Sequence, residues 1–197
     1  MKVHCGWLLM AVAVSFGCGK AERNEAVTLC KVLEQSRADF ATANSQEKDL
    51  LGGVRAWAEG IIANGGGRPA ELEQNANVAK DLSNSAAGIG TRLGQVREAL
   101  SNLALHEEYL QGIRTDLINK IARRQRLLQE VRVALQDTAA GFDGFRQSRA
   151  YTGDTYPGGI DKLNSLVQGY KEPDDSVAQA AAGLRTKYKI TNADLGS

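Results

Sequence analysis

The chain has 197 residues, of which 6% are aromatic and only three are proline, a composition that favours helices over a β-sandwich. Its formal net charge is +1 at pH 7, so the chain as a whole has no electrostatic bias towards nucleic acid or another polyanion. The length is sufficient for one domain with a substantial hydrophobic core.

The N-terminus has the features of a signal peptide. Lys2 gives it a short basic start, residues 7–16 are an apolar run, and Gly17-Cys18 follows directly. The run is too short for a membrane-spanning helix, which needs about 20 apolar residues. These residues resemble the precursor of a bacterial lipoprotein, in which a small residue precedes a cysteine that is lipidated and becomes the first residue.

The resemblance implies a signal peptide at 1–17, a lipidated anchor at 18–21 with fatty acyl (palmitate-type) chains on Cys18, and a membrane-anchored place in the cell envelope. With glycine after the cysteine, it implies the outer membrane, facing the periplasm. Ser15 and Gly17 also fit an ordinary secretory cleavage site at the same bond. In either case Cys30 is left as a single thiol, which packs as a small apolar residue or pairs between chains.

A heptad pattern over residues 22–63 predicts a long first helix, in one or two segments because Gly52-Gly53 interrupts its middle. Nine of its eleven seam positions are apolar, namely all but Ser36 and Glu47 in the set Ala26, Leu29, Leu33, Ser36, Phe40, Ala43, Glu47, Leu50, Val54, Trp57 and Ile61. Asn64 to Gly67 ends this helix, and so short a connection predicts an antiparallel neighbour.

A second heptad frame runs from Leu72 to Phe145, with 17 of 22 seam positions apolar. Its charged exceptions are Glu107, Arg114 and Arg124. An unbroken helix over 70–147 would be a rod about 110 Å long at 1.5 Å per residue. A break near 106–112 would give two helices of ordinary bundle length, and the sequence leaves both architectures open.

The predicted fold is therefore all-α, with long antiparallel helices in heptad packing, as a helical hairpin or four-helix-type bundle. A glycine-rich stretch at 141–159 ends the long helix, and apolar spacing predicts two short C-terminal helices at 160–170 and 177–188. We expect one helical domain over 22–190 and a frayed tail at 191–197.

Two segments are candidates for contact with a ligand or partner. The first, at 120–132, is locally basic and contains Lys120, Arg123, Arg124, Arg126 and Arg132. The second is a glycine-rich loop at 151–159 that contains Tyr151 and Tyr156. A solvated helix surface and tyrosines folded over the end of the bundle are the alternative interpretations. His4 and His106 are the only histidines, so we expect no catalytic residues, metal site or cofactor.

These features predict a non-catalytic envelope lipoprotein that acts as a helical adaptor, spacer or assembly subunit. Its partners would be the membrane, through the N-terminal lipid, and a protein partner or a second copy, through helix faces, with no nucleic acid. The alternative is a periplasmic binder of anionic lipid or a cell-wall ligand, through residues 120–132 or 151–159.

Overall fold

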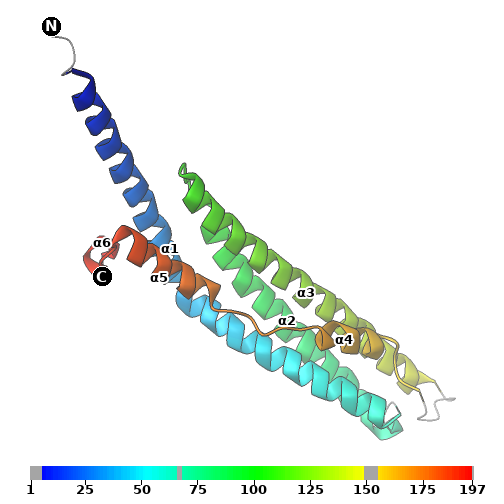
Figure 1. Ribbon diagram of the computed structural model, residues 1–197. Coiled ribbons are helices and arrows are strands. Elements are labelled where there is room, and N and C mark those ends of the chain that lie inside the picture. The colour runs from blue at the N-terminus through cyan, green and yellow to red at the C-terminus, as the bar shows by residue number, and fades with distance from the viewer. Residues whose placement is uncertain (1–5, 66–67, 149–154, 197) are drawn as a thin grey trace. The chain divides into compact units, whose positions relative to one another are not determined.

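The computed structural model in Figure 1 describes residues 6–65, 68–148 and 155–196, with the backbone alone at 6–18 and 69. It is 85% helical and has no strand in these residues, which confirms the all-α prediction. The helices are α1 (Gly6–Ala63), α2 (Leu72–Ser101), α3 (Glu108–Gln147), α4 (Gly159–Gln168), α5 (Ser176–Tyr188) and α6 (Asn192–Leu195), with a 3-10 turn at Pro69–Glu71 before α2.

The chain forms two compact units, and the three long helices contribute to both. Unit 1 contains residues 1–38, 97–119 and 176–197, and unit 2 contains residues 39–96 and 120–175. Each unit is described separately below.

In unit 2, α1, α2 and α3 bury the heptad seams predicted from the sequence. Lys80 Nζ lies 2.9 Å from Asp143 Oδ2, and Gln125 donates to the Gly90 carbonyl at 3.0 Å, so the start of α2 meets the end of α3 and the two helices are antiparallel. The buried apolar seam residues in this unit are Phe40, Ala43, Leu50, Val54, Ile61, Leu72, Ala79, Ala86, Ile89, Leu93, Val96, Ile121, Leu128, Val131, Leu135 and Phe142. Heptad spacing therefore predicted the core.

Helix α4 is fixed closely against α3. A Cβ atom added at Gly159 would lie 2.3 Å from the Thr138 Oγ1 atom, and one added at Gly141 would lie 2.6 Å from Pro157 Cβ. Only glycine permits this approach of the two backbones. Helix α4 also reaches α1, because the Arg55 guanidinium donates to the Val167 carbonyl, and it buries Ile160, Leu163 and Val167.

In unit 1 the chain folds back between α2 and α3. Helix α2 ends at Ser101 and α3 begins at Glu108, so the break lies at 102–107 and the unbroken rod does not form. Gly112 lies inside α3 and does not cause the break. The Glu25 carboxylate of α1 accepts hydrogen bonds from the backbone N–H groups of His106 (2.8 Å) and Glu107 (3.1 Å), and so caps the start of α3 from another helix.

Helices α5 and α6 pack on α1 within unit 1. Arg185 Nε lies 2.8 Å from Glu34 Oε1, and the free thiol of Cys30 is fully buried beside the Ala181 carbonyl, at 3.8 Å. In place of the frayed tail predicted at 191–197, Asn192–Leu195 form α6, which has a capping box at its start and buries Leu195. The pattern Thr191-x-x-Asp194 is the sequence signal for this capping box.

Candidate functional site

Arg124, one of the predicted contact residues, forms an ion pair inside unit 2. Its Nη2 atom lies 2.7 Å from Glu47 Oε2, and the exposed fractions of the two side chains are 14% and 1%. The guanidinium also lies 4.9 Å from the centre of the Phe40 ring. Glu47 and Arg124 are polar exceptions in the two heptad frames, and the fold pairs them with each other. Arg124 is thus a half-buried residue that is paired within unit 2.

The segment 169–175, which follows α4, lies beside this pair. Burial raises the pKa of the Tyr170 phenol, and the negative charge of nearby Glu47 raises it further. Three polar contacts fix the same segment to α1 and α3: Lys48 with Glu172 at 3.0 Å, Lys120 with Asp174 at 3.7 Å, and Asn44 with the Asp174 carbonyl at 3.3 Å. Lys120 therefore forms an ion pair with another segment of the fold.

The other basic residues of the predicted segment differ in exposure. Arg123 and Arg126 are exposed, whereas Arg132 is half-buried and lines a hollow between α2 and α3. Of the five basic residues, the structure thus leaves only Arg123 and Arg126 exposed for an anionic ligand.

The tyrosine loop and the anchor are only partly described. Tyr156 is half-buried, and its hydroxyl donates to Asp161 Oδ1 at 3.1 Å. This hydrogen bond to a carboxylate raises the pKa of Tyr156. Tyr151 and the side chain of Cys18 lie outside the described residues, so both remain predictions.

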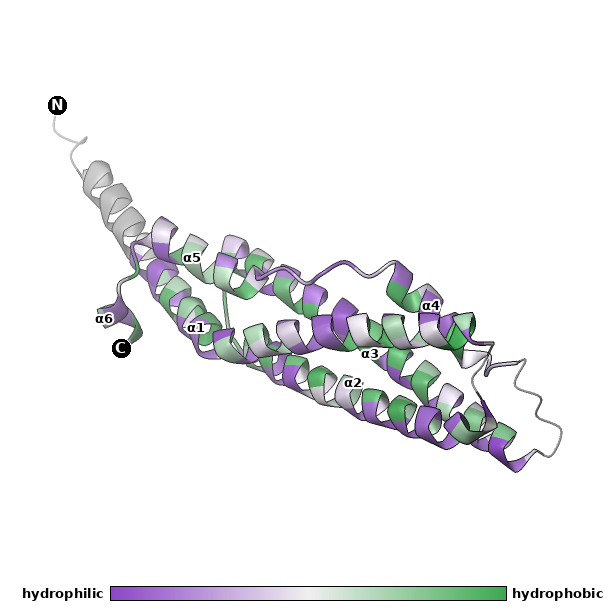
Figure 2. Cartoon of the chain, turned by 90° about the horizontal axis from the view of Figure 1, so that it is seen from below, coloured by the Kyte–Doolittle hydropathy of each residue, from purple (hydrophilic) through white to green (hydrophobic). Residues whose placement is uncertain are grey.

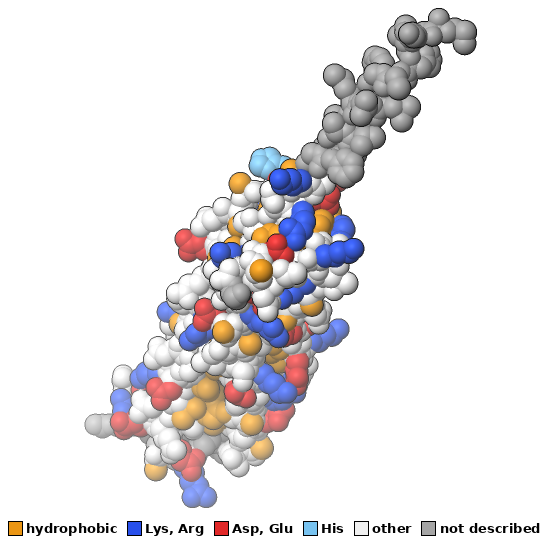
Figure 3. Space-filling view, turned by 90° about the vertical axis from the view of Figure 1, so that its left-hand side faces the viewer, with side chains coloured by type: hydrophobic (Ala, Val, Ile, Leu, Met, Phe, Trp, Pro, Cys, Tyr) orange, Lys and Arg blue, Asp and Glu red, His pale blue; other side chains and the backbone are white. Residues whose placement is uncertain are grey.

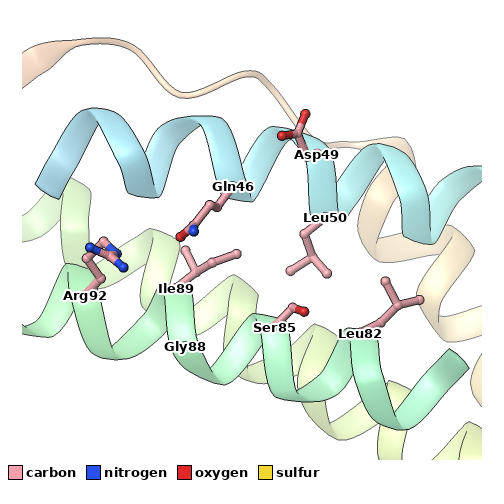
Figure 4. Close-up of a pocket in the computed structure, with 8 residues that line it drawn as sticks. All are labelled: Gln46, Asp49, Leu50, Leu82, Ser85, Gly88, Ile89 and Arg92. Atoms are coloured by element: carbon pink, nitrogen blue, oxygen red, sulfur yellow. The ribbon is translucent and has the colours of Figure 1, made fainter. Parts of the chain in front are cut away.

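The surface of unit 2 has an open groove between α1 and α2 (Figure 4). Leu50, Leu82 and Ile89 supply its apolar part, and Ser85 and Gly88 leave room beside them. The remaining lining residues are polar: Gln46, Asp49 and Arg92. The volume of the groove is about 400 Å³, which suits a few side chains of a partner rather than a large ligand.

Similar hollows continue along this scaffold. One lies further along α1 and α2, between residues 56–64 at the end of α1 and residues 71–75 at the start of α2. Another lies between α2 and α3, around Gly90 and Gly94. In contrast, α4 and the segment 169–175 cover the surface between α1 and α3. The three-helix scaffold of unit 2 thus has one side covered by its own chain and two sides with open hollows.

The described side chains include no group of three or more metal-binding residues. Within the same residues, no helix is both long and apolar enough to cross a membrane, and hydrophilic and hydrophobic residues alternate along each long helix in Figure 2. Comparisons with models of protein families, with characterised proteins and with solved structures find no match to this chain.

The groove between α1 and α2 was missed from the sequence. Two small residues of α2, Ala79 and Ala86, are buried in its heptad seam. Gly88 and Gly90, however, have no atom within 4 Å of an added Cβ, so they open the surface instead. Their place outside the heptad seam was the signal that distinguished them.

Proposed function

We propose that this chain is a non-catalytic envelope lipoprotein, anchored through Cys18 and acting as a helical adaptor, spacer or assembly subunit. The lipid would hold the protein on the outer membrane, facing the periplasm. The supporting pattern is the short apolar run followed by Gly17-Cys18.

The groove between α1 and α2 carries the adaptor part of the proposal. Unit 2 already accepts one amphipathic helix, because α4 buries Ile160, Leu163 and Val167 against the neighbouring side of the same scaffold. The open groove has an apolar floor of Leu50, Leu82 and Ile89 beside polar side chains, and of these three Leu50 and Ile89 are 5% and 3% exposed. We expect a partner to lay the apolar face of a helix into it, as in other helix-in-groove interfaces.

The contacts of two groups of charged residues support the non-catalytic part. Glu47 and Arg124 neutralise each other in the core, and Glu25 caps α3 with the participation of His106, whose Nδ1 lies 2.9 Å from Glu25 Oε1. These groups have structural partners in the fold, which is the expectation for a binding scaffold.

The anchor is tested by labelling cells with a fatty acid analogue and isolating the protein. Replacement of Cys18 by alanine should abolish the label, whereas Cys30→Ala and Cys5→Ala should keep it. Equal labelling of the wild type and Cys18→Ala would contradict the anchor.

The groove is tested by a change that fills it. Gly88→Leu adds a side chain where no atom lies within 4 Å of the new Cβ, so the helix should be preserved or stabilised while the groove is blocked. We expect proteins that co-purify with the wild type to be lost with Gly88→Leu and kept with Gly144→Leu, a matched change on α3 that also points into open space. Unchanged co-purification with Gly88→Leu would show that partners bind elsewhere.

A further inference from the structure

One end of unit 1 gathers segments that are far apart in the sequence around the first described turns of α1. Glu22 accepts a hydrogen bond from the Tyr188 hydroxyl at the end of α5, and Arg23 lies 3.0 Å from Asp194 of α6. Glu25 binds the start of α3, as described above. Because Glu22 follows Cys18 by four residues, about 6 Å along a helix, this end lies next to the proposed anchor.

Three acidic side chains of this end, those of Glu22, Glu25 and Asp194, contact other groups of the protein. Lys20, Lys187 and Lys189 are exposed. Glu108 is exposed as well, at the start of α3, where the helix dipole stabilises it. In Figure 3, Lys and Arg side chains are visible around the first described turns of α1.

An exposed aromatic ring accompanies the lysines. The Tyr109 side chain is 51% exposed, and Lys187 Nζ lies 3.3 Å from the centre of its ring. Tyrosine combines an apolar ring with a polar tip, and tyrosine and lysine together are typical of surfaces at the level of lipid headgroups.

Lys189 occupies a backbone position that favours glycine. Its φ is +53°, in the left-handed region, and the Ile190 N–H donates to the Arg185 carbonyl at 3.1 Å to close the end of α5. Glycine is the usual residue at this position, because a Cβ atom disfavours the left-handed conformation. A lysine here is therefore poorly explained by stability, and a role for its side chain explains it better.

We propose that Lys20, Tyr109, Lys187 and Lys189 form a contact surface for the headgroups of anionic phospholipids in the membrane that carries the anchor. The inference rests on the proposed lipid anchor, which would keep these ammonium groups near the bilayer. Electrostatic attraction extends over about 8 Å at physiological ionic strength, and Lys20 follows Cys18 by only two residues, about 3 Å along a helix. The contact surface would orient the protein on the membrane, whereas the lipid anchor would attach it.

The test measures how the membrane protects these lysines from acetylation. The full chain, purified from membranes, is reconstituted in vesicles of phosphatidylcholine alone or of equal parts phosphatidylcholine and phosphatidylglycerol. Acetylation of each lysine is followed by mass spectrometry. We expect acetylation of Lys187 and Lys189 to slow several-fold in the anionic vesicles, and high salt to reverse the effect. Lys162 on α4 of unit 2, which is also exposed, should be unchanged.

Lys189→Gly separates a binding role from a structural one. Because glycine accepts the left-handed conformation, this variant should unfold at the same or a higher temperature than the wild type. The protection of Lys20 and Lys187 in anionic vesicles should nevertheless decrease. Lys162→Ala, the control, should keep full protection.

Two failures can be told apart. If the N-terminal peptide carries lipid but acetylation is equal in both kinds of vesicle, the contact surface is wrong and the anchor stands. If that peptide carries no lipid and the chain does not sediment with either vesicle, the anchor and the contact surface fall together. Full protection of Lys20 and Lys187 in the Lys189→Gly variant would show that Lys189 is not part of the contact surface.

Discussion

The ion pair between Glu47 and Arg124 predicts a measurable energetic coupling in the core of unit 2. Arg124→Met removes the countercharge of Glu47, whose side chain is only 1% exposed. Breaking a buried pair by removing one partner costs about 3–5 kcal/mol. Arg124 keeps 14% exposure, so solvent offsets part of the loss and we expect a cost of about 3 kcal/mol. For a chain of this size the Tm should fall by about 6–12 °C.

The double variant Glu47→Leu with Arg124→Met supplies the decisive comparison. With both charges replaced by apolar side chains, neither is left buried without a partner, and the layer becomes an ordinary apolar part of the heptad seam. We expect its free energy of unfolding to lie within about 1 kcal/mol of the wild type. The interaction energy from the double-mutant cycle should then be about 2 kcal/mol or more.

Urea unfolding followed by circular dichroism measures the free energy of unfolding of the wild type, of the single variants Glu47→Leu and Arg124→Met, and of the double variant. Arg123→Met is the matched control, because Arg123 is the exposed neighbour of Arg124 and its replacement should change stability by less than about 0.5 kcal/mol. If the double variant loses the sum of the two single losses, the charges are not coupled and the structural reason given for the seam exceptions is wrong.

Three further predictions concern single residues. Hydrogen bonds from two backbone N–H groups at the start of α3 lower the pKa of the Glu25 carboxyl group. The contribution of Glu25 to stability is therefore present above pH 4.5, the ordinary pKa of this group, and is lost as the pH falls through its lowered pKa. The Tm of Glu25→Gln should therefore fall less steeply than that of the wild type on acidification. Gly159→Ala places a Cβ 2.3 Å from Thr138 Oγ1 and should cost about 1–3 kcal/mol in urea unfolding, whereas Gly144→Ala, with open space around it, should not destabilise. Burial raises the pKa of the Cys30 thiol, so a thiol reagent should modify the folded chain far more slowly than the unfolded chain; equal rates would show that Cys30 is accessible.

The buried positions of the long helices were predictable because heptad spacing reports directly which side of a helix is covered. Phe40 on α1, Leu93 on α2 and Leu128 on α3 were assigned to seams, and each is at most 1% exposed. Ser36 and Glu47 are buried too, although both are polar. The period therefore predicted burial even where residue type argued against it.

The end of α2 was not predictable in the same way. The seam residues Leu103 and Leu110 keep the heptad period across the break, so periodicity alone favoured a continuous helix. The turn at 102–107 is stabilised by a contact that is distant in sequence, from Glu25 to the start of α3, and by a contact across the turn itself, from the Arg114 guanidinium to the Leu103 carbonyl. A pattern read along one helix carries no information about a cap supplied by another.

The same distinction explains the candidate site. Local composition made Lys120 and Arg124 candidates for contact with a ligand, but their partners Asp174 and Glu47 come from other parts of the chain. Charge density along a helix therefore says little about surface charge when heptad packing places some of its positions in the core. The groove between α1 and α2 follows the same rule, because its floor includes the seam residues Leu50 and Ile89, which are 5% and 3% exposed, and its room comes from Ser85 and Gly88 outside the seam.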